Sequence, residues 1–150
     1  MKDLKIAIGA DHGGFELKNQ LLGFLRDKGC SVQDCGTHSK EAVDYPRIAY
    51  TVARLVASGQ CDRGIMIDGA GIGSAMTANK VRGVRAAACY NVALAKNSRQ
   101  HNDANVLTLG AKYLDEEHAL DLIHVFLNTE FAGGRHARRV AKIAQLEQGR

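Results

Sequence analysis

Several features that would place the protein in a specialised class are scarce in its sequence. Tryptophan is absent, and only four tyrosines and four phenylalanines occur, too few for the stacking platform that single-stranded nucleic acids need. The apolar runs are short and no apolar core follows Met1, so we expect neither a membrane span nor a signal peptide. A single proline fits a chain with little irregular loop. These absences favour an ordinary globular protein.

The four cysteines show none of the spacings that bind metals or carry out thiol exchange. Cys30, Cys35, Cys61 and Cys89 form no C-x-x-C pair and, although His38 follows Cys35 by three residues, no set of Cys and His with zinc-site spacing, which argues against a zinc or thioredoxin-like motif. Scattered thiols of this kind are typical of small core or strand-end residues in a reducing compartment. We therefore expect no metal site and a cytoplasmic protein.

Length and charge indicate one domain with an unusual C-terminal end. A chain of 150 residues is ordinary for one domain, and we assign residues 1–150 to it. Residues 1–134 carry 15 Lys/Arg and 15 Asp/Glu, so the net charge of +4 comes entirely from the last sixteen residues. Glu147 is the one acid among the five basic residues there, which are Arg135, Arg138, Arg139, Lys142 and Arg150.

Short apolar runs alternate with helical patterns along the chain, which predicts an α/β fold. Strands are expected at residues 5–10, 31–34, 63–68, 85–89 and 105–110. Helices are expected at 15–28, from Asp44 to Ser58, through Ala75 and Val81, and at 92–99, 115–128 and 135–147. The sequence therefore predicts a Rossmann-like doubly wound five-stranded parallel sheet in three α/β/α layers, with a C-terminal helix.

Ligands of such sheets bind beyond the carboxyl ends of the strands, which draws attention to residues 9–14, 34–45, 68–74, 90 and 99–105. At the end of the first strand, Asp11 and His12 would project into this crevice, and the neighbouring glycines would let the backbone approach a ligand. Asp is also a preferred helix cap, so capping of the first helix is an equal alternative for Asp11.

A glycine-rich turn, Asp68–Ser74, follows the third strand. Alternate glycines before a helix leave backbone N–H groups pointing inward, where they can hold an anion or a developing oxyanion. The turn is not a dinucleotide fingerprint, because its sixth position is Ser74 and no acid follows strand four. It is not a P-loop either, because no Gly-Lys-Ser/Thr sequence follows. Alone, such a turn is weak evidence for a site.

Two further segments are rich in polar side chains. Residues 98–105 include His101, a residue type that carries protons near neutral pH, although a solvated loop is the alternative for a segment with Asn and Asp turn residues. In the basic tail, Arg135 and Arg139 lie four residues apart on one helix face and would form a phosphate clamp. The alternatives are a solvated surface and a nucleic-acid contact, and the patch is small for the latter.

Taken together, these segments resemble the type B ribose-5-phosphate isomerases and the related galactose-6-phosphate isomerase subunits. The resemblance runs in order through nearly the whole chain and includes the glycine turn together with Asp11–Gly14, Asp44–Pro46, Ala78–Lys80, Ser98–Val106 and Gly133–His136. It implies an aldose–ketose isomerase of a small phosphorylated sugar that needs no metal or organic cofactor. It also implies a homodimer or homotetramer with its sites between subunits, and no nucleic-acid or membrane partner.

The resemblance implies a role for each candidate residue. His101 would open the sugar ring, with Asp11 and Tyr45 binding hydroxyls near it. The enediolate oxygens would be held by Asn102 and by the backbone amides of Gly69, Ala70, Gly71, Ile72 and Gly73. The phosphate would be gripped by His12, Arg135 and Arg139. Enolisation needs such a set: a base, a preorganised oxyanion site and a remote binding handle.

The chain departs from the family at the position of the base. Type B enzymes commonly have Cys where this chain has Asp68 and Thr or Ser where it has Ala70, and a variant that uses Glu has it where this chain has Ser74. One galactose-6-phosphate isomerase subunit resembles this chain in having Asp at the Cys position. Either Asp68 is the enolising base, as a carboxylate can be, or it only binds substrate in a non-catalytic or partner-dependent subunit. We expect the first, with ribose 5-phosphate as substrate and a tetrose or hexose phosphate as the alternative.

Overall fold

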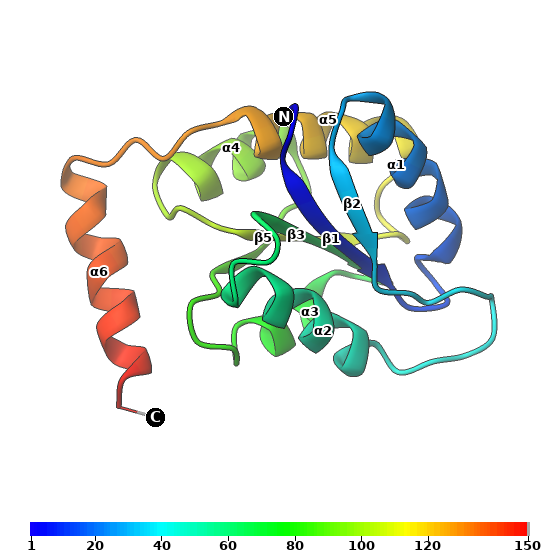
Figure 1. The fold of residues 1–150 in the computed structure, drawn as a ribbon, viewed down its shortest axis with the longest axis horizontal. Coiled ribbons are helices and arrows are strands. Elements are labelled where there is room, and N and C mark those ends of the chain that lie inside the picture. Colours follow the sequence, from blue (N-terminus) through cyan, green and yellow to red (C-terminus); the bar gives the residue numbers. More distant parts are fainter. Residues whose placement is uncertain (150) are drawn as a thin grey trace.

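The computed structural model describes residues 1–149 and contains a five-stranded sheet whose paired strands are all parallel (Figure 1). The strands are β1 (Lys5–Ala10), β2 (Ser31–Asp34), β3 (Arg63–Asp68), β4 (Ala86–Ala88) and β5 (Val106–Gly110), in the spatial order β2-β1-β3-β5-β4. Because β5 lies between β3 and β4, the short strand β4 forms one edge of the sheet. Arg150, counted above in the basic tail, lies outside the described residues.

Helices cover both faces of the sheet, which confirms the predicted three-layer, Rossmann-like fold. α1 (Phe15–Asp27), α4 (Val92–Gln100) and α5 (Glu116–Asn128) lie on one face, and α2 (Tyr45–Ala57) and α3 (Ile72–Ala78) lie on the other (Figure 1). The observed bounds differ from the predicted ones by about a residue at most ends. The exception is α3, which was expected to reach Val81.

The core consists of two apolar layers, one on each face of the sheet. On β3, Ile65 and Ile67 pack into the layer beneath α1, α4 and α5, while Met66 packs into the layer beneath α2. This alternation follows from the two-residue period of a strand, and burial on both faces confirms the predicted interior position of β3. Each fully buried side chain of this size contributes about 2 kcal/mol to folding.

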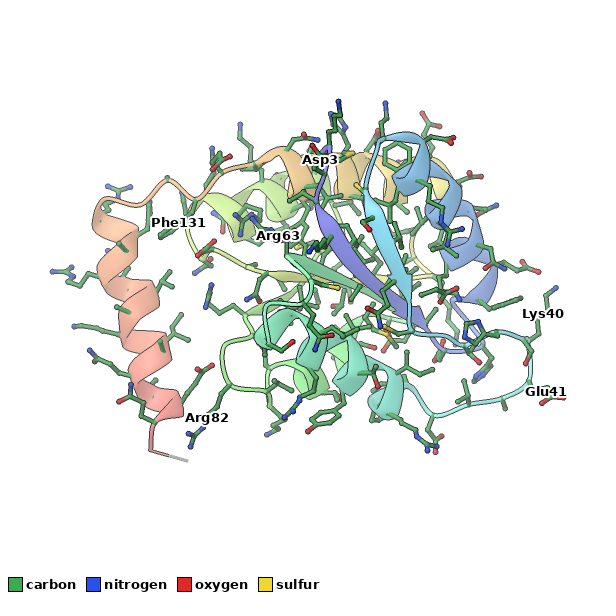
Figure 2. All side chains as sticks on the ribbon, in the orientation of Figure 1. Asp3, Lys40, Glu41, Arg63, Arg82 and Phe131 are labelled. Carbon is green, nitrogen blue, oxygen red and sulfur yellow. The ribbon has the colours of Figure 1, made fainter. Side chains whose placement is uncertain are left out.

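A buried lysine fixes the loop between β2 and α2. The Lys18 side chain is fully buried, and its ammonium group donates to both carboxylate oxygens of Asp34, at 2.7 and 2.9 Å, and to the Thr37 carbonyl at 2.7 Å. Figure 2 shows Lys40 and Glu41 at the outer bend of the same loop. The loop then leads into α2, so its fixed start helps to place the first residues of that helix.

The last helix, α6 (Arg135–Glu147), stands away from the sheet (Figure 1). His136 is its one buried residue among those described, and Ile143 and Leu146 are exposed. Figure 2 shows Arg82 beside the C-terminal turn of α6, where the Gly83 amide donates to Glu147 Oε2 at 3.1 Å. A cavity of about 420 Å³ opens between α6 and the β4 edge. Within residues 1–149, every helix is too short or too polar to span a membrane.

Candidate active site

Several predicted site residues meet where β1 and β3 end. We call this group the carboxyl-end cluster; it comprises Asp11, His12, Tyr45, Asp68, the turn residues 69–74, Tyr90 and Lys112. β1 and β3 are neighbours in the sheet, and the Asp11 amide donates to the Ile67 carbonyl at 3.1 Å. The two strand ends are therefore held side by side, as the strand-end rule for α/β sheets predicts.

Asp11 holds the turn that leads into α1. Its Oδ1 accepts from the amides of Gly13, at 2.9 Å, and Gly14, at 3.2 Å. The N-cap residue of α1 is Gly14 and no side chain caps this helix end, so Asp11 does not cap the first helix. Glycine at position 14 is explained by packing against β3, because a Cβ there would lie 2.6 Å from the Ile67 carbonyl oxygen.

His12 contacts the loop before α2. The Val43 amide lies 3.2 Å from His12 Nδ1. In the tautomer in which Nδ1 accepts this hydrogen bond, the ring proton is on Nε2. The exposed side of the ring can then donate to an anion, as the predicted phosphate contact requires.

The carboxylate of Asp68 organises the glycine turn. Asp68 is 4% exposed; its Oδ1 accepts from the Gly71 amide, and its Oδ2 accepts from the Ser74 amide at 3.2 Å and the Ser74 hydroxyl at 2.8 Å. On β5, the Thr108 hydroxyl donates to the Gly71 carbonyl at 2.7 Å. The turn is therefore held rigidly before any ligand binds.

The amides of Ile72 and Gly73 begin α3 and so have no acceptor within that helix. The Tyr45 ring lies against Gly73: a Cβ on Gly73 would be 2.1 Å from the Tyr45 hydroxyl oxygen, so a larger residue there would displace the tyrosine. Tyr90 donates its hydroxyl hydrogen to the Ala70 carbonyl at 2.5 Å. Partial burial and then the nearby Asp68 charge raise the pKa of Tyr90, which keeps this phenol a donor.

Lys112 is a member of the cluster that sequence reasoning missed. Its amide donates to the Gly69 carbonyl at 3.1 Å, and its Nζ lies 3.8 Å from where a Cβ on Gly69 would be. A positive charge thus lies beside the glycine turn. Lys112 follows the end of β5 by two residues, so the strand-end rule applied to the fifth strand would have found it.

The other predicted residues form a second group together with His136, for which the sequence predicted no role. We call it the histidine–arginine cluster: His101, Asn102, Arg135, His136 and Arg139. The rings of His101 and His136 stack with centroids 4.1 Å apart and planes 12° apart. Desolvation, followed by the charges of His101 and the two arginines, lowers the pKa of His136. The neutral form of His136 is therefore favoured, and it can stack on His101 without charge repulsion.

The expectation that residues 99–105 lie at the carboxyl ends of the strands is wrong. α4 begins beyond the carboxyl end of β4 and returns across the sheet, so this segment precedes β5 at the amino ends. Val106 pairs with Gly64 at the start of β3, whereas Asp68 pairs with Gly110 at its end. Four strand residues span about 13 Å. Within one chain, His101 and Asp68 therefore belong to opposite ends of the sheet.

Residues 98–105 are nevertheless not a solvated loop. Arg99 is buried, and its guanidinium donates to Asp103 Oδ1 at 2.8 Å, to the Ala104 carbonyl at 2.6 Å and to the Thr129 carbonyl at 3.1 Å. Arg85 also binds Asp103, at 3.2 Å. This network fixes the turn that carries His101 and Asn102 and ties it to the end of α5.

Comparison with known proteins shows the family of the chain. Residues 6–143 match the family described as Ribose/Galactose Isomerase. The chain belongs to this family. The resemblance inferred from the motifs is thus confirmed.

Proteins from several bacteria align with almost the whole chain. Ribose-5-phosphate isomerase B of Escherichia coli is 44% identical over 146 residues, which cover 97% of this chain and 98% of that protein. D-erythrulose-4-phosphate isomerase of Pectobacterium atrosepticum is 41% identical over an alignment that covers 96% of this chain and 95% of that protein. The structure of ribose-5-phosphate isomerase B from Clostridium thermocellum superimposes with a TM-score of 0.96 at 51% identity, covering 97% and 99%.

Proposed function

We propose that this member of the family interconverts ribose 5-phosphate and ribulose 5-phosphate through an enediolate, with Asp68 as the base. The observation that carries the proposal is the position of the Asp68 carboxylate: it is buried at the end of β3, directly under the glycine turn. The similarity of the chain to ribose-5-phosphate isomerase B proteins from E. coli and C. thermocellum supports ribose 5-phosphate as the substrate.

In the proposed reaction, His101 assists opening of the sugar ring, and Asp11 and Tyr45 bind hydroxyls of the open chain. Asp68 takes the proton from C2 while the electron pair moves to the C1 carbonyl oxygen. The amides of Gly69 to Gly73, together with Asn102, stabilise the charge on the enediolate oxygens. The proton then returns to C1 and the O2 hydroxyl hydrogen moves to O1, which yields the ketose with all atoms accounted for.

His12, Arg135 and Arg139 would bind the phosphate. Arginine forks and an imidazole N–H donor suit phosphate oxygens, and binding the remote phosphate positions the reacting carbons. Lys112 adds a further positive charge beside the turn. No step of this scheme requires a metal or an organic cofactor.

We propose further that the complete site forms between two copies of the chain. The carboxyl-end cluster and the histidine–arginine cluster lie at opposite ends of one sheet, so one chain cannot enclose a small sugar with both. In a two-fold dimer, the histidine–arginine cluster of each copy can meet the carboxyl-end cluster of the other, giving two equivalent sites. The exposed Ile143 and Leu146 on α6 would be covered in such an assembly.

The first prediction tests Asp68 as the base. Wild-type protein incubated with ribose 5-phosphate in deuterated water should form ketose and incorporate solvent deuterium at the carbon that accepts the proton, as followed by NMR. Asp68→Asn should lower kcat by about 1,000-fold or more, because the amide cannot accept the proton. Inhibition by inorganic phosphate should stay unchanged, since the phosphate residues are intact. Turnover by folded Asp68→Asn near the wild-type rate would show that the base lies elsewhere.

Two observations favour other functions: a different sugar phosphate as substrate, and a subunit that binds sugar phosphates without converting them. Similarity to D-erythrulose-4-phosphate isomerase favours a tetrose phosphate as substrate. The three hydrogen bonds donated to Asp68 would equally suit a carboxylate that only holds the turn of a binding subunit. Turnover assays with tetrose, pentose and hexose phosphates separate these cases, because a binding subunit converts none of them.

A further inference from the structure

We propose that Ser74 is a positioning residue for the proton transfer, because its buried hydroxyl holds the Asp68 carboxylate in the orientation that receives the substrate proton. The inference rests on the proposed role of Asp68 as the base. It concerns how the Asp68 carboxylate can accept a proton from the substrate while it also holds the glycine turn.

The contact is short and completely enclosed. Ser74 is 0% exposed, and its Oγ lies 2.8 Å from Asp68 Oδ2. The Ser74 amide reaches the same oxygen at 3.2 Å, while the Gly71 amide binds Oδ1. The two oxygens are therefore held from different points of the turn, which fixes the rotation of the carboxylate.

The distribution of donors distinguishes the two oxygens. An ionised carboxylate offers roughly four acceptor positions, two on each oxygen. Oδ2 accepts two hydrogen bonds and is saturated, whereas Oδ1 accepts one. The free position is thus on Oδ1, and the Ser74 hydroxyl is the side-chain contact that keeps Oδ2 from taking that role.

The Ser74 hydroxyl also behaves differently from other hydroxyls on the helices. Thr51 on α2 and Thr77 on α3 donate to carbonyls of their own helices, at 3.0 and 2.9 Å, which is the common local bond of such residues. The Ser74 hydroxyl instead leaves α3 and binds a side chain at the end of β3. Its main effect should therefore be on Asp68 rather than on the helix.

Kinetics of Ser74→Ala test this role. Loss of the hydroxyl lets the carboxylate rotate, and reacting atoms must be aligned within narrow limits. We expect kcat for ribose 5-phosphate to fall by about 10- to 100-fold while KM and inhibition by inorganic phosphate change by less than about 3-fold. The isotope effect with substrate deuterated at C2 should increase. Ser74→Thr, which keeps the hydroxyl, should recover most of kcat, and Thr51→Ala should behave like wild type.

The possible results separate this inference from the function on which it rests. An active wild type together with Ser74→Ala of unchanged kcat, folded by circular dichroism, overturns the positioning role and leaves the isomerase intact. A fall in kcat matched by an equal rise in KM, or no recovery in a folded Ser74→Thr, also overturns it. A wild type that converts no tetrose, pentose or hexose phosphate overturns the proposed function and this inference together.

Discussion

Three aspartates show how single residues connect this fold to its site. Asp11, Asp34 and Asp68 each lie at or directly after the end of one of the first three strands, and each accepts a hydrogen bond from a glycine amide two or three residues further on. Aspartate is suited to this position because its short carboxylate reaches the backbone of the following turn. The same arrangement that ends a strand thus leaves a buried carboxylate beside the ligand crevice, and at Asp68 we propose that chemistry uses it.

The cysteines allow a second prediction at this scale. Burial, followed by the charges of Cys61 and Asp34, raises the pKa of Cys35 to about 11, and burial also raises the pKa of Cys30, Cys61 and Cys89. At about pH 8 only about 0.1% of Cys35 would be thiolate, the form that reacts.

Ellman's reagent at about pH 8 should therefore label the native protein slowly, with a rate that rises as the pH approaches 11. All four cysteines should react at once in denaturant. Rapid reaction of two or more thiols in the native protein would contradict the burial described here. The free state of all four in the structure agrees with the expectation of scattered core and strand-end thiols.

Among the elements, the loop from β2 to α2 depends on Lys18. Burial works against ionisation of Asp34, but the hydrogen bond and charge of Lys18 and the Gly36 amide together hold the pKa of Asp34 below its ordinary 3.8. A carboxyl group whose pKa is lower in the folded state stabilises the fold above its unfolded pKa, and this contribution is lost as the pH falls through the folded value. The ion pair should therefore contribute fully at neutral pH.

Lys18→Met should lower the free energy of unfolding by about 3 kcal/mol at pH 7, because it leaves Asp34 and the Thr37 carbonyl without their buried donor. Urea denaturation measures the change. Lys40→Met is the matched control: its ion pair with Glu16 is exposed, and water screens such pairs so that they contribute little to stability. The difference between the two variants should shrink as the pH falls below about 4, and equal effects at pH 7 would refute the role given to Lys18.

At the scale of the whole molecule, the division of the site makes a sharp prediction. Asp68→Asn and His101→Asn each disable both sites of a homodimer, but in a mixed dimer both changes fall in one site and the other site is intact. Equal amounts of the two variants, unfolded and refolded together, should recover about one quarter of wild-type activity, since half of the dimers are mixed and each has one working site.

Each variant refolded alone is the control and should stay inactive. No recovery in the mixture, although light scattering shows dimers, would place Asp68 and His101 of the same chain in one site. Such a result would contradict the separation of the two clusters along the sheet.

The fold could be predicted closely because its signals are local. Apolar runs, helix spacing and turn residues fix where each strand and helix lies, and these patterns depend only on neighbours along the chain. Asp11, Asp68 and the glycine turn could be placed together because each lies next to the carboxyl end of a strand, and Tyr45 could be added because it begins the helix that follows β2. The burial of Lys18 and Arg99 could not be predicted. Lysine and arginine are rarely buried, and the partners that allow it here are distant in the sequence.

The sequence by itself determined the layers of the fold, the family and the residue types needed for sugar-phosphate chemistry. Only the tertiary structure decided the strand order, in which β5 inserts between β3 and β4, and brought His136 of α6 onto His101. Only the tertiary structure also showed the hydroxyl of Ser74 on the carboxylate of Asp68. The position of residues 99–105 already followed from the predicted parallel sheet, because a segment that precedes a parallel strand lies at the amino ends whatever the strand order. Strand order and contacts between distant side chains depend instead on how the elements pack, which no local pattern encodes.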